Sequence, residues 1–279
     1  MTTHLFDQAL WLEPAGSERP NSWRGSTSPA YWNMVGPFGG STAATALQAV
    51  LQHPLLLGEP VSLTVNYASA TAEGEFDITA TPVRTNRSTQ HWVISLSQPD
   101  AQGQDMTVMT ATAMTALQRD TWEMNDMPMP NVPSPQAVAR ARLDAPMEWL
   151  NRYDMRFIRG AIPEKWNGAE QLGPDSLSQL WVRDDVPRPV DFTSLTAMSD
   201  VFYPRVWLRR PIHVPAGTVS MTTYFHASAA QLKEAGTGYV LAQASAQAFR
   251  HGFFDQAAQL WSQGGTLLAT SHQLVYFRQ

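Results

Sequence analysis

The chain of 279 residues contains no cysteine, which excludes disulfide bonds, thiolate metal sites and a cysteine nucleophile. A cysteine-free chain is compatible with a reducing compartment, and we expect a cytoplasmic location. The opening residues, MTTHLFDQALWLEPAG, lack a basic stretch followed by an apolar one, so we expect no signal peptide. No apolar run approaches the ~20 residues that cross a bilayer, so we expect no membrane partner.

Charged side chains are also sparse. They make up 15% of the chain, and the formal net charge is −5. No cluster of lysine and arginine is long enough to follow a phosphate backbone, which argues against a nucleic-acid partner. The seven histidines show no HxxxH or other paired spacing, so we expect neither a metal site nor another cofactor.

Apolar residues are plentiful, and the chain is punctuated at its centre. Hydrophobic residues account for 43% of the sequence, including ten tryptophans and eleven phenylalanines, which is ample for a core. The stretch DMPMPNVPSP, at 126–135, repeats proline too closely for a helix or a central strand. We therefore predict a linker at 117–145 between an N-terminal unit, 1–116, and a C-terminal unit, 146–279.

The two units show the same order of patterns. In the first, GPFGGSTAATALQAVLQHP predicts a helix within 36–54, followed by β-rich segments at 61–70, 75–86, 87–98 and 105–117. In the second, β-rich segments occupy 152–160 and 176–185, a helix is expected at 191–203 before Pro204, and further β-rich segments follow at 217–228, 238–254, 255–263 and 266–278. The order predicts a duplicated α+β unit in which each of two antiparallel sheets wraps around a central helix.

Three polar residues interrupt apolar elements of the second unit. Asp200 lies among the apolar residues of the predicted helix, Thr218 opens a strand, and Gln273 lies inside the last strand. A carboxylate, a hydroxyl and an amide can together hold one water molecule, with the aspartate as its general base. Water aligned in this way can attack an acyl carbonyl without a covalent intermediate.

An oxyanion formed in that attack would need N–H donors. Phe38, Gly39 and Gly40 open the first predicted helix, and glycine lets backbone approach a ligand closely. The N–H of Gly40 or of its neighbour is our candidate donor.

Structural explanations exist for each of these residues. Asp200 could cap a loop or pair with Arg205 or Arg209, and Thr218 is an ordinary strand residue. Gln273 could satisfy a sheet edge, and a Gly-Gly pair is a weak signal of anything beyond a tight turn.

Comparison of the two units favours a single functional site. When Ser220-Met221-Thr222 is aligned with Ser62-Leu63-Thr64, Thr218 falls opposite Pro60. Matching the final strands puts Gln273 near Ala113, and Asp200 falls near the uncharged Thr42. A structural requirement of the fold should appear in both units, whereas these polar residues occur in one.

Six motifs occur in this order along the chain: GPFGGSTAATAL, PVSLTVNYASATAEGEFDI, RTNRS, TAMSD, TVSMTTYFH and LLATSHQ. In this ordered set the sequence resembles the acyl-CoA thioesterase II group of the thioesterase-like proteins. The resemblance implies a tandem double hotdog fold and hydrolysis of acyl-CoA, the expected partner, to a free acid and CoA. It also implies that Asp200, Thr218 and Gln273 orient the attacking water, and that further association into homo-oligomers is common.

Two arginines are candidates for substrate contacts, and two functions other than thioester hydrolysis also fit the sequence. Arg84 and Arg87 in RTNRS could contact CoA phosphates, although a solvated turn also explains them. A hotdog hydratase or dehydratase would need an acid–base pair, for which His226 or His272 could serve. A non-catalytic acyl-CoA binding module is the other alternative.

Overall fold

The strands of the computed structural model form one continuous antiparallel sheet. The structure describes residues 3–141, 147–163, 166 and 172–278 of the chain. The first half contributes β1 (Glu13–Pro14), β2 (Ser22–Ser26), β3 (Glu59–Tyr67), β4 (Glu75–Thr85), β5 (Thr89–Pro99) and β6 (Asp105–Ala116). The second half contributes β7 (Tyr153–Arg159), β8 (Ser178–Asp184), β9 (Ala216–Phe225), β10 (Val240–Ser245), β11 (Phe249–Arg250), β12 (Phe253–Ser262) and β13 (Leu267–Phe277).

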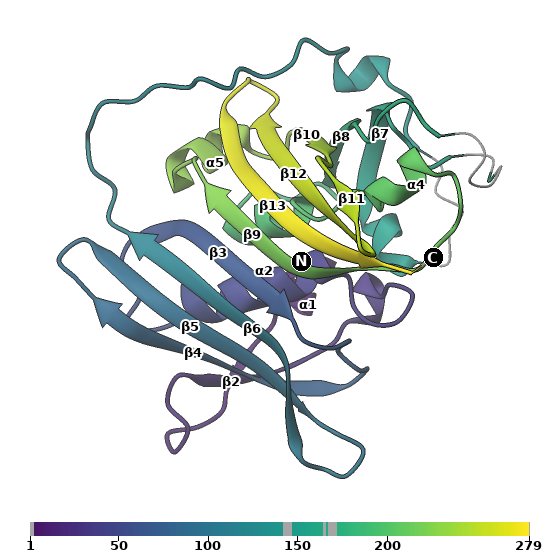
Figure 1. Cartoon of the computed structure of the whole chain (residues 1–279). Helices are drawn as coiled ribbons and strands as arrows, with labels where there is room; N and C mark the ends of the chain where they lie inside the picture. The colour runs from purple at the N-terminus through teal and green to yellow at the C-terminus, as the bar shows by residue number, and fades with distance from the viewer. Residues whose placement is uncertain (1–2, 142–146, 164–165, 167–171, 279) are drawn as a thin grey trace.

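The order of strands is the same in both halves, read from the outside inward. Across the sheet it runs β1-β2-β4-β5-β6-β3 and then β9-β13-β12-β10-β8-β7, while β11 pairs only with β12 (Figure 1). The two predicted antiparallel sheets are thus joined edge to edge into one, because β3 and β9 pair with each other. At the centre of this junction Thr64 lies opposite Thr222, and their hydroxyl oxygens are 3.0 Å apart.

The halves also share a register irregularity. In the first half Ser62 pairs with Met114 and Pro60 with Thr115, so one residue of β3 is extra. In the second half Ser220 pairs with Leu274 and Thr218 with Val275, which places the same bulge in β9. A bulge of this kind re-aims the side chains beside it. The register thus agrees with the alignment of Thr218 with Pro60.

Two buried helices pack against each other inside the curved sheet. Helix α2 (Gly39–Leu51) contacts β4, β5 and β6, and it also packs on α3 (Phe192–Met198). Most of the α2 residues are alanine, threonine, leucine or valine, and all of these except Leu51 are buried. Helices that are apolar on all sides in this way belong in a core.

The second predicted helix is shorter than expected. It begins at Asp191, whose carboxylate accepts the Ser194 N–H at 2.8 Å as an N-cap, and it ends at Met198. Pro204 does not stop this helix but instead caps α4 (Arg205–Arg209). The residue before a proline avoids the α region, so Tyr203 cannot join the two helices into one.

Besides α4, two α-helices and three 3₁₀ turns were not predicted. Helix α1 (Leu5–Ala9) precedes the first strand, and α5 (Ala229–Ala235) follows β9 and begins with a capping box between Ser228 and Gln231. The 3₁₀ turns are η1 (Pro29–Tyr31), η2 (Pro135–Ala137) and η3 (Glu148–Arg152).

The proline-rich segment packs against the second half of the chain. Residues 117–134 contain no helix or strand. The indole of Trp181 donates to the Pro133 carbonyl at 2.8 Å, and that of Trp261 donates to the Met127 carbonyl at 3.1 Å. The end of the predicted linker, 142–145, lies outside the described residues.

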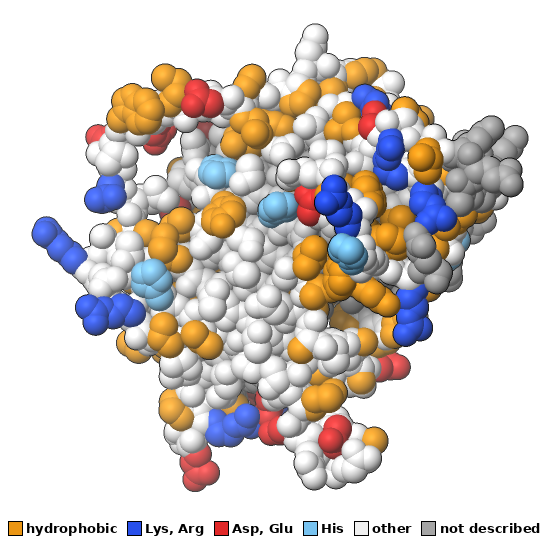
Figure 2. Space-filling model, viewed as in Figure 1, with side chains coloured by type: hydrophobic (Ala, Val, Ile, Leu, Met, Phe, Trp, Pro, Cys, Tyr) orange, Lys and Arg blue, Asp and Glu red, His pale blue; other side chains and the backbone are white. Residues whose placement is uncertain are grey.

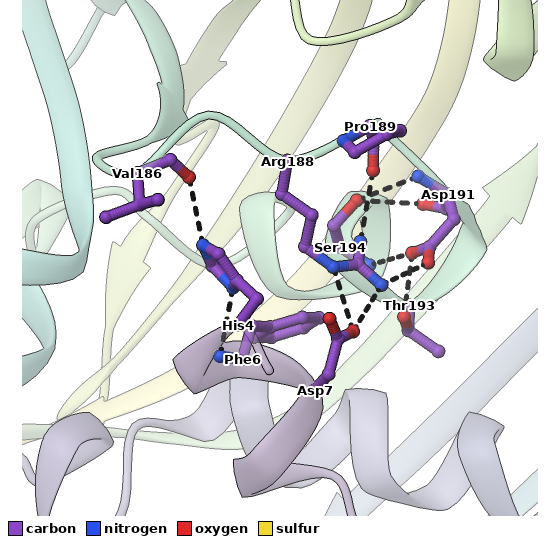
Figure 3. A network of polar contacts seen from close by, with 9 residues as sticks. All are labelled: His4, Phe6, Asp7, Val186, Arg188, Pro189, Asp191, Thr193 and Ser194. Atoms are coloured by element: carbon purple, nitrogen blue, oxygen red, sulfur yellow. Dashed lines mark hydrogen bonds and ion pairs between the residues drawn. The ribbon is translucent and has the colours of Figure 1, made fainter. Parts of the chain in front are cut away.

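An ion-pair network ties the N-terminal helix to the second half. Arg188 donates to Asp7 of α1 at 2.9 and 2.7 Å and to Asp191, the N-cap of α3, at 2.5 Å (Figure 3). Close by, the His4 ring lies 2.9 Å from the Val186 carbonyl.

Within the described ranges no helix combines the length and apolarity needed to cross a membrane.

Candidate active site

Asp200 stands two residues beyond the end of α3, with its carboxylate turned toward the sheet. Its Oδ1 accepts a hydrogen bond of 2.9 Å from Nε2 of Gln273. Neither Arg205 nor Arg209 pairs with it. Arg205 is fully buried and donates instead to the carbonyls of Tyr203 and Ser176 and to the Ser178 hydroxyl. The structure therefore offers no ion-pairing explanation for Asp200 within the described residues.

Gln273 connects the carboxylate to the threonine. It is 4% exposed on β13, and its Nε2 also lies 3.2 Å from the Ser199 carbonyl. Its Oε1 accepts a long hydrogen bond of 3.4 Å from Thr218 Oγ1 on β9. With donor and acceptor both engaged, the amide has one orientation, and it holds Asp200 and Thr218 on either side of itself.

The N-terminus of α2 approaches Asp200 closely because it begins with two glycines. A Cβ at Gly39 would lie 2.8 Å from Asp200 Oδ2 and 3.5 Å from the Tyr67 hydroxyl. A Cβ at Gly40 would lie 2.6 Å from both the Ala197 carbonyl oxygen and the Phe38 ring. The contacts of 2.8 Å and 2.6 Å are shorter than those that real Cβ atoms make, so lack of space explains glycine at these two positions.

Tyr67 belongs to this group, although no sequence pattern pointed to it. The last residue of β3 donates its hydroxyl proton to the Gly39 carbonyl at 2.8 Å. Burial, and then the charge of Asp200, raise the pKa of this phenol well above its ordinary value. A tyrosine that closes an apolar strand looks like a core residue, and only the folded chain brings it to Asp200.

Burial also raises the pKa of Asp200, to about 7. Hydrogen bonds from the Gln273 side chain and the Gly40 backbone act in the opposite direction, because they favour the carboxylate. A carboxylate with a pKa near neutrality can both accept and return a proton, as a general base must. Because the Gly40 N–H already donates to Asp200, the N–H of Gly39 is the better placed of the two to donate to a ligand.

These groups share one cavity of about 640 Å³. Its polar wall includes Gly39, Tyr67, Asp200, Thr218 and Gln273. Its apolar walls include Trp149, Phe202, Trp207, Phe254 and Val275. A cavity of this size, mostly apolar with a few convergent polar groups, is typical of a small-molecule site.

The remaining predicted residues fall into two groups. Phe38 lines the cavity and stacks on Trp149, with ring centroids 4.1 Å apart. Arg84 and Arg87 lie at the other end of the sheet, because Thr85 and Thr89 flank the β4–β5 turn and Thr89 pairs with Ala116, opposite Glu59. From Glu59 to Tyr67 is about 26 Å along β3. The structure does not bring these two arginines to the cavity.

The histidines considered for an acid–base pair are also elsewhere. His226 lies 2.9 Å from the Thr270 hydroxyl, and His272 lies 3.4 Å from Asp255, and neither side chain lines the cavity. Among the described residues no three His, Cys, Asp or Glu side chains converge on a common point where a metal could bind.

Comparison with known families identifies the kind of protein. Residues 28–116 match the acyl-CoA thioesterase N-terminal domain, and residues 123–277 match the acyl-CoA thioesterase C-terminal domain. The chain therefore belongs to the acyl-CoA thioesterase family, as the resemblance implied.

Solved structures share the fold of this chain. A conserved hot dog fold protein of unknown function from Alicyclobacillus acidocaldarius is 43% identical over 100% of this chain and 99% of that one, with a TM-score of 0.90. Acyl-CoA thioesterase II TesB2 from Mycobacterium marinum is 18% identical over 98% of both chains, with a TM-score of 0.75. The dehydratase domain of PpsC from Mycobacterium tuberculosis, in complex with C12:1-CoA, is 13% identical over 92% of this chain and 93% of that one, with a TM-score of 0.53. The likenesses below a quarter identity show the fold alone. Comparison with curated proteins gives no match.

Proposed function

We propose that this chain is a double hotdog thioesterase that hydrolyses acyl-CoA to a free acid and CoA. The observation that carries the proposal is a carboxylate with a pKa of about 7, held by Gln273 at 2.9 Å and facing a mostly apolar cavity. Membership of the acyl-CoA thioesterase family supports the choice of substrate. The apolar walls of the cavity suit an acyl chain.

The reaction follows from the positions of the polar groups. Asp200 takes a proton from a water molecule as that water attacks the thioester carbonyl. Thr218 and Gln273 fix the direction of its lone pairs. The resulting oxyanion receives a hydrogen bond from the Gly39 N–H, where the start of α2 favours negative charge. The tetrahedral intermediate then breaks its carbon–sulfur bond, and protonated Asp200 returns its proton to the CoA sulfur.

The proposal is tested by Asp200→Asn. We expect this variant to fold normally and to lose at least about a thousandfold in kcat, measured as thiol release over a panel from acetyl-CoA to palmitoyl-CoA. The matched control is Asp255→Asn, which alters an aspartate on β12 that lies outside the cavity. Equal kcat values for Asp200→Asn and the wild type would reject Asp200 as the base.

Isotope labelling separates direct attack by water from a covalent intermediate on Asp200. In a single turnover in oxygen-18-labelled water, the proposed reaction puts one labelled oxygen into the acid and none into Asp200. A labelled Asp200 side chain after several turnovers would show that the carboxylate itself attacks. Binding of acyl-CoA without any thiol release would support the non-catalytic alternative.

A further inference from the structure

A second cavity, of about 550 Å³, lies beside the first and is strongly basic. Its lining includes Arg209 and Arg210 at the end of α4 together with Arg250 and His251 at the β11–β12 turn. Phe249 and Phe277 supply an aromatic wall, and none of the described aspartates and glutamates lines the cavity. In Figure 2, basic side chains gather with hydrophobic ones over the region of α4, β11 and the C-terminus. Concentrated positive charge in a concave site favours an anionic ligand.

The arginines are available for such a ligand. Arg209, Arg210 and Arg250 take part in no ion pair among the described residues. Arg209 uses one nitrogen to hold the Gly173 carbonyl at 2.5 Å, which orients its guanidinium. Guanidinium groups match phosphate oxygens in pairs, and several together suit a ligand with more than one phosphate.

The turn that carries Arg250 is rigid. His251 and Gly252 have φ angles of +54° and +75°, the left-handed pair of a tight two-residue hairpin turn, and Arg250 pairs with Phe253 across it. The Gly252 carbonyl also accepts the Phe277 N–H at 2.8 Å, which fastens the turn to the end of β13. The backbone hydrogen bonds of this turn thus fix the position of Arg250 and His251.

The two cavities are adjacent along the chain and along β13. Val206, Gly252 and Phe277 line the basic cavity, while their sequence neighbours Trp207, Phe253 and Tyr276 line the apolar one. From Gln273 to Phe277 is four strand residues, about 13 Å. The pantetheine arm of CoA has the contour length of about four residues, roughly 15 Å, between its sulfur and its first phosphate.

We propose that the cavity formed by Arg209, Arg210 and Arg250 binds the phosphates of CoA while the thioester lies at Asp200. This inference rests on the proposed function, since it assigns the other end of the same substrate. It also replaces Arg84 and Arg87 as the phosphate contact with residues that the fold places within reach.

Direct titration of CoA and of pantetheine, which lacks phosphates, tests the assignment. We expect the Arg210→Gln, Arg250→Gln double variant to bind CoA about tenfold more weakly than the wild type and to bind pantetheine unchanged. The control is Arg84→Gln, Arg87→Gln, which removes the same charge at the far end of the sheet and should leave CoA affinity unaltered. Equal loss in both double variants would indicate net charge alone, and unchanged CoA binding in the first would overturn the assignment.

Hydrolysis provides the separate readout. Acyl-CoA should show a KM about tenfold higher in the Arg210→Gln, Arg250→Gln variant with kcat retained, while acyl-pantetheine should show the wild-type KM. If neither substrate is hydrolysed by any form of the protein, the proposed function fails, and the titration still decides where CoA binds.

Discussion

At the scale of the residue, burial sets the behaviour of two aspartates in opposite roles. Asp200 faces a cavity and keeps hydrogen bonds that favour its charge, and its pKa is about 7. Asp184, on β8, is 2% exposed, neither of its oxygens has a partner among the described residues, and burial raises its pKa to about 7 as well. The same rise in pKa suits the proposed general base at position 200 and is a cost to folding at position 184.

The activity should follow the ionisation of Asp200. A general base must be deprotonated, so we expect kcat/KM to be low in acid and to rise with pH through a midpoint near 7. Gln273→Met keeps the volume of the side chain but removes the hydrogen bond that lowers this pKa. We therefore expect a weaker enzyme whose midpoint lies at higher pH, measured over pH 5 to 9. A midpoint that stayed in place or moved to lower pH would contradict the assigned contact.

Stability should follow the ionisation of Asp184. Its pKa is higher in the folded chain than in the unfolded chain, where it is about 3.9. The folded state therefore holds this proton more tightly, and the stability it confers is complete below about pH 3.9 and lost as the pH rises to about 7.

Asp184→Asn removes that loss. We expect the variant to gain about 2–4 kcal/mol of unfolding free energy relative to the wild type between pH 4 and pH 8, measured by denaturant titration at both values. Asp120→Asn, at an exposed position outside the helices and strands, is the control and should show no comparable change. A constant difference between variant and wild type at the two pH values would mean that Asp184 is already ionised at pH 4.

At the scale of the element, the site depends on how closely the start of α2 approaches the end of α3. Gly39 gives room to the carboxylate of Asp200, whereas Gly40 gives room to the backbone of Ala197. A side chain at position 39 would contact the proposed general base, and a side chain at position 40 would contact the core.

Two alanine substitutions should separate these effects. Gly39→Ala should reduce kcat at least tenfold with little change in unfolding free energy, because its methyl group displaces the Asp200 carboxylate. Gly40→Ala should lower the unfolding free energy by about 1–3 kcal/mol, since backbone cannot yield easily and the ~1 kcal/mol gain in helix propensity only partly offsets it. Thermal unfolding and thiol release measured on both variants test the distinction. Similar losses of stability in the two would refute it.

The elements also show which parts of the molecule the sequence could reveal. Asp200, Thr218 and Gln273 stood out as polar residues in apolar surroundings, and the shared Ser-x-Thr pattern at Ser62 and Ser220 matched the strand register. Other features join segments that lie far apart in the chain. These are the pairing of β3 with β9, the contact of Tyr67 with Gly39 and the approach of α4 to the β11–β12 turn. Local patterns carry no information on such contacts, because they arise only when the halves pack.

At the scale of the whole molecule, the two halves are joined by more than the proline-rich segment. The sheet is continuous through β3 and β9, and the Arg188 network holds α1 of the first half against the N-cap of α3 in the second. Burial alone would raise the pKa of Asp191, but its bonds to Arg188 outweigh burial and lower it. The network is therefore charged at neutral pH and fixes how the N-terminus docks.

Removal of Arg188 should loosen this docking. We expect Arg188→Met to lower the unfolding free energy by about 1–3 kcal/mol, since Arg188 is 13% exposed and leaves two carboxylates unpaired. A double-mutant cycle with Asp7→Asn should give a coupling energy of at least about 0.5 kcal/mol. Arg19→Met, which breaks the more exposed pair with Asp77, should cost less than about 0.5 kcal/mol. Strict additivity in the cycle would show that the contact contributes nothing.

The repeated bulge has a consequence for how such a molecule can change over time. When identical subunits associate, every substitution appears twice, so neither copy can give up the reaction without the other. Here Pro60 occupies in one half the place that Thr218 occupies in the other, and proline has no hydroxyl to offer. Within one polypeptide, two halves can keep the same backbone while their side chains differ, so the proposed reaction needs polar groups from one half alone.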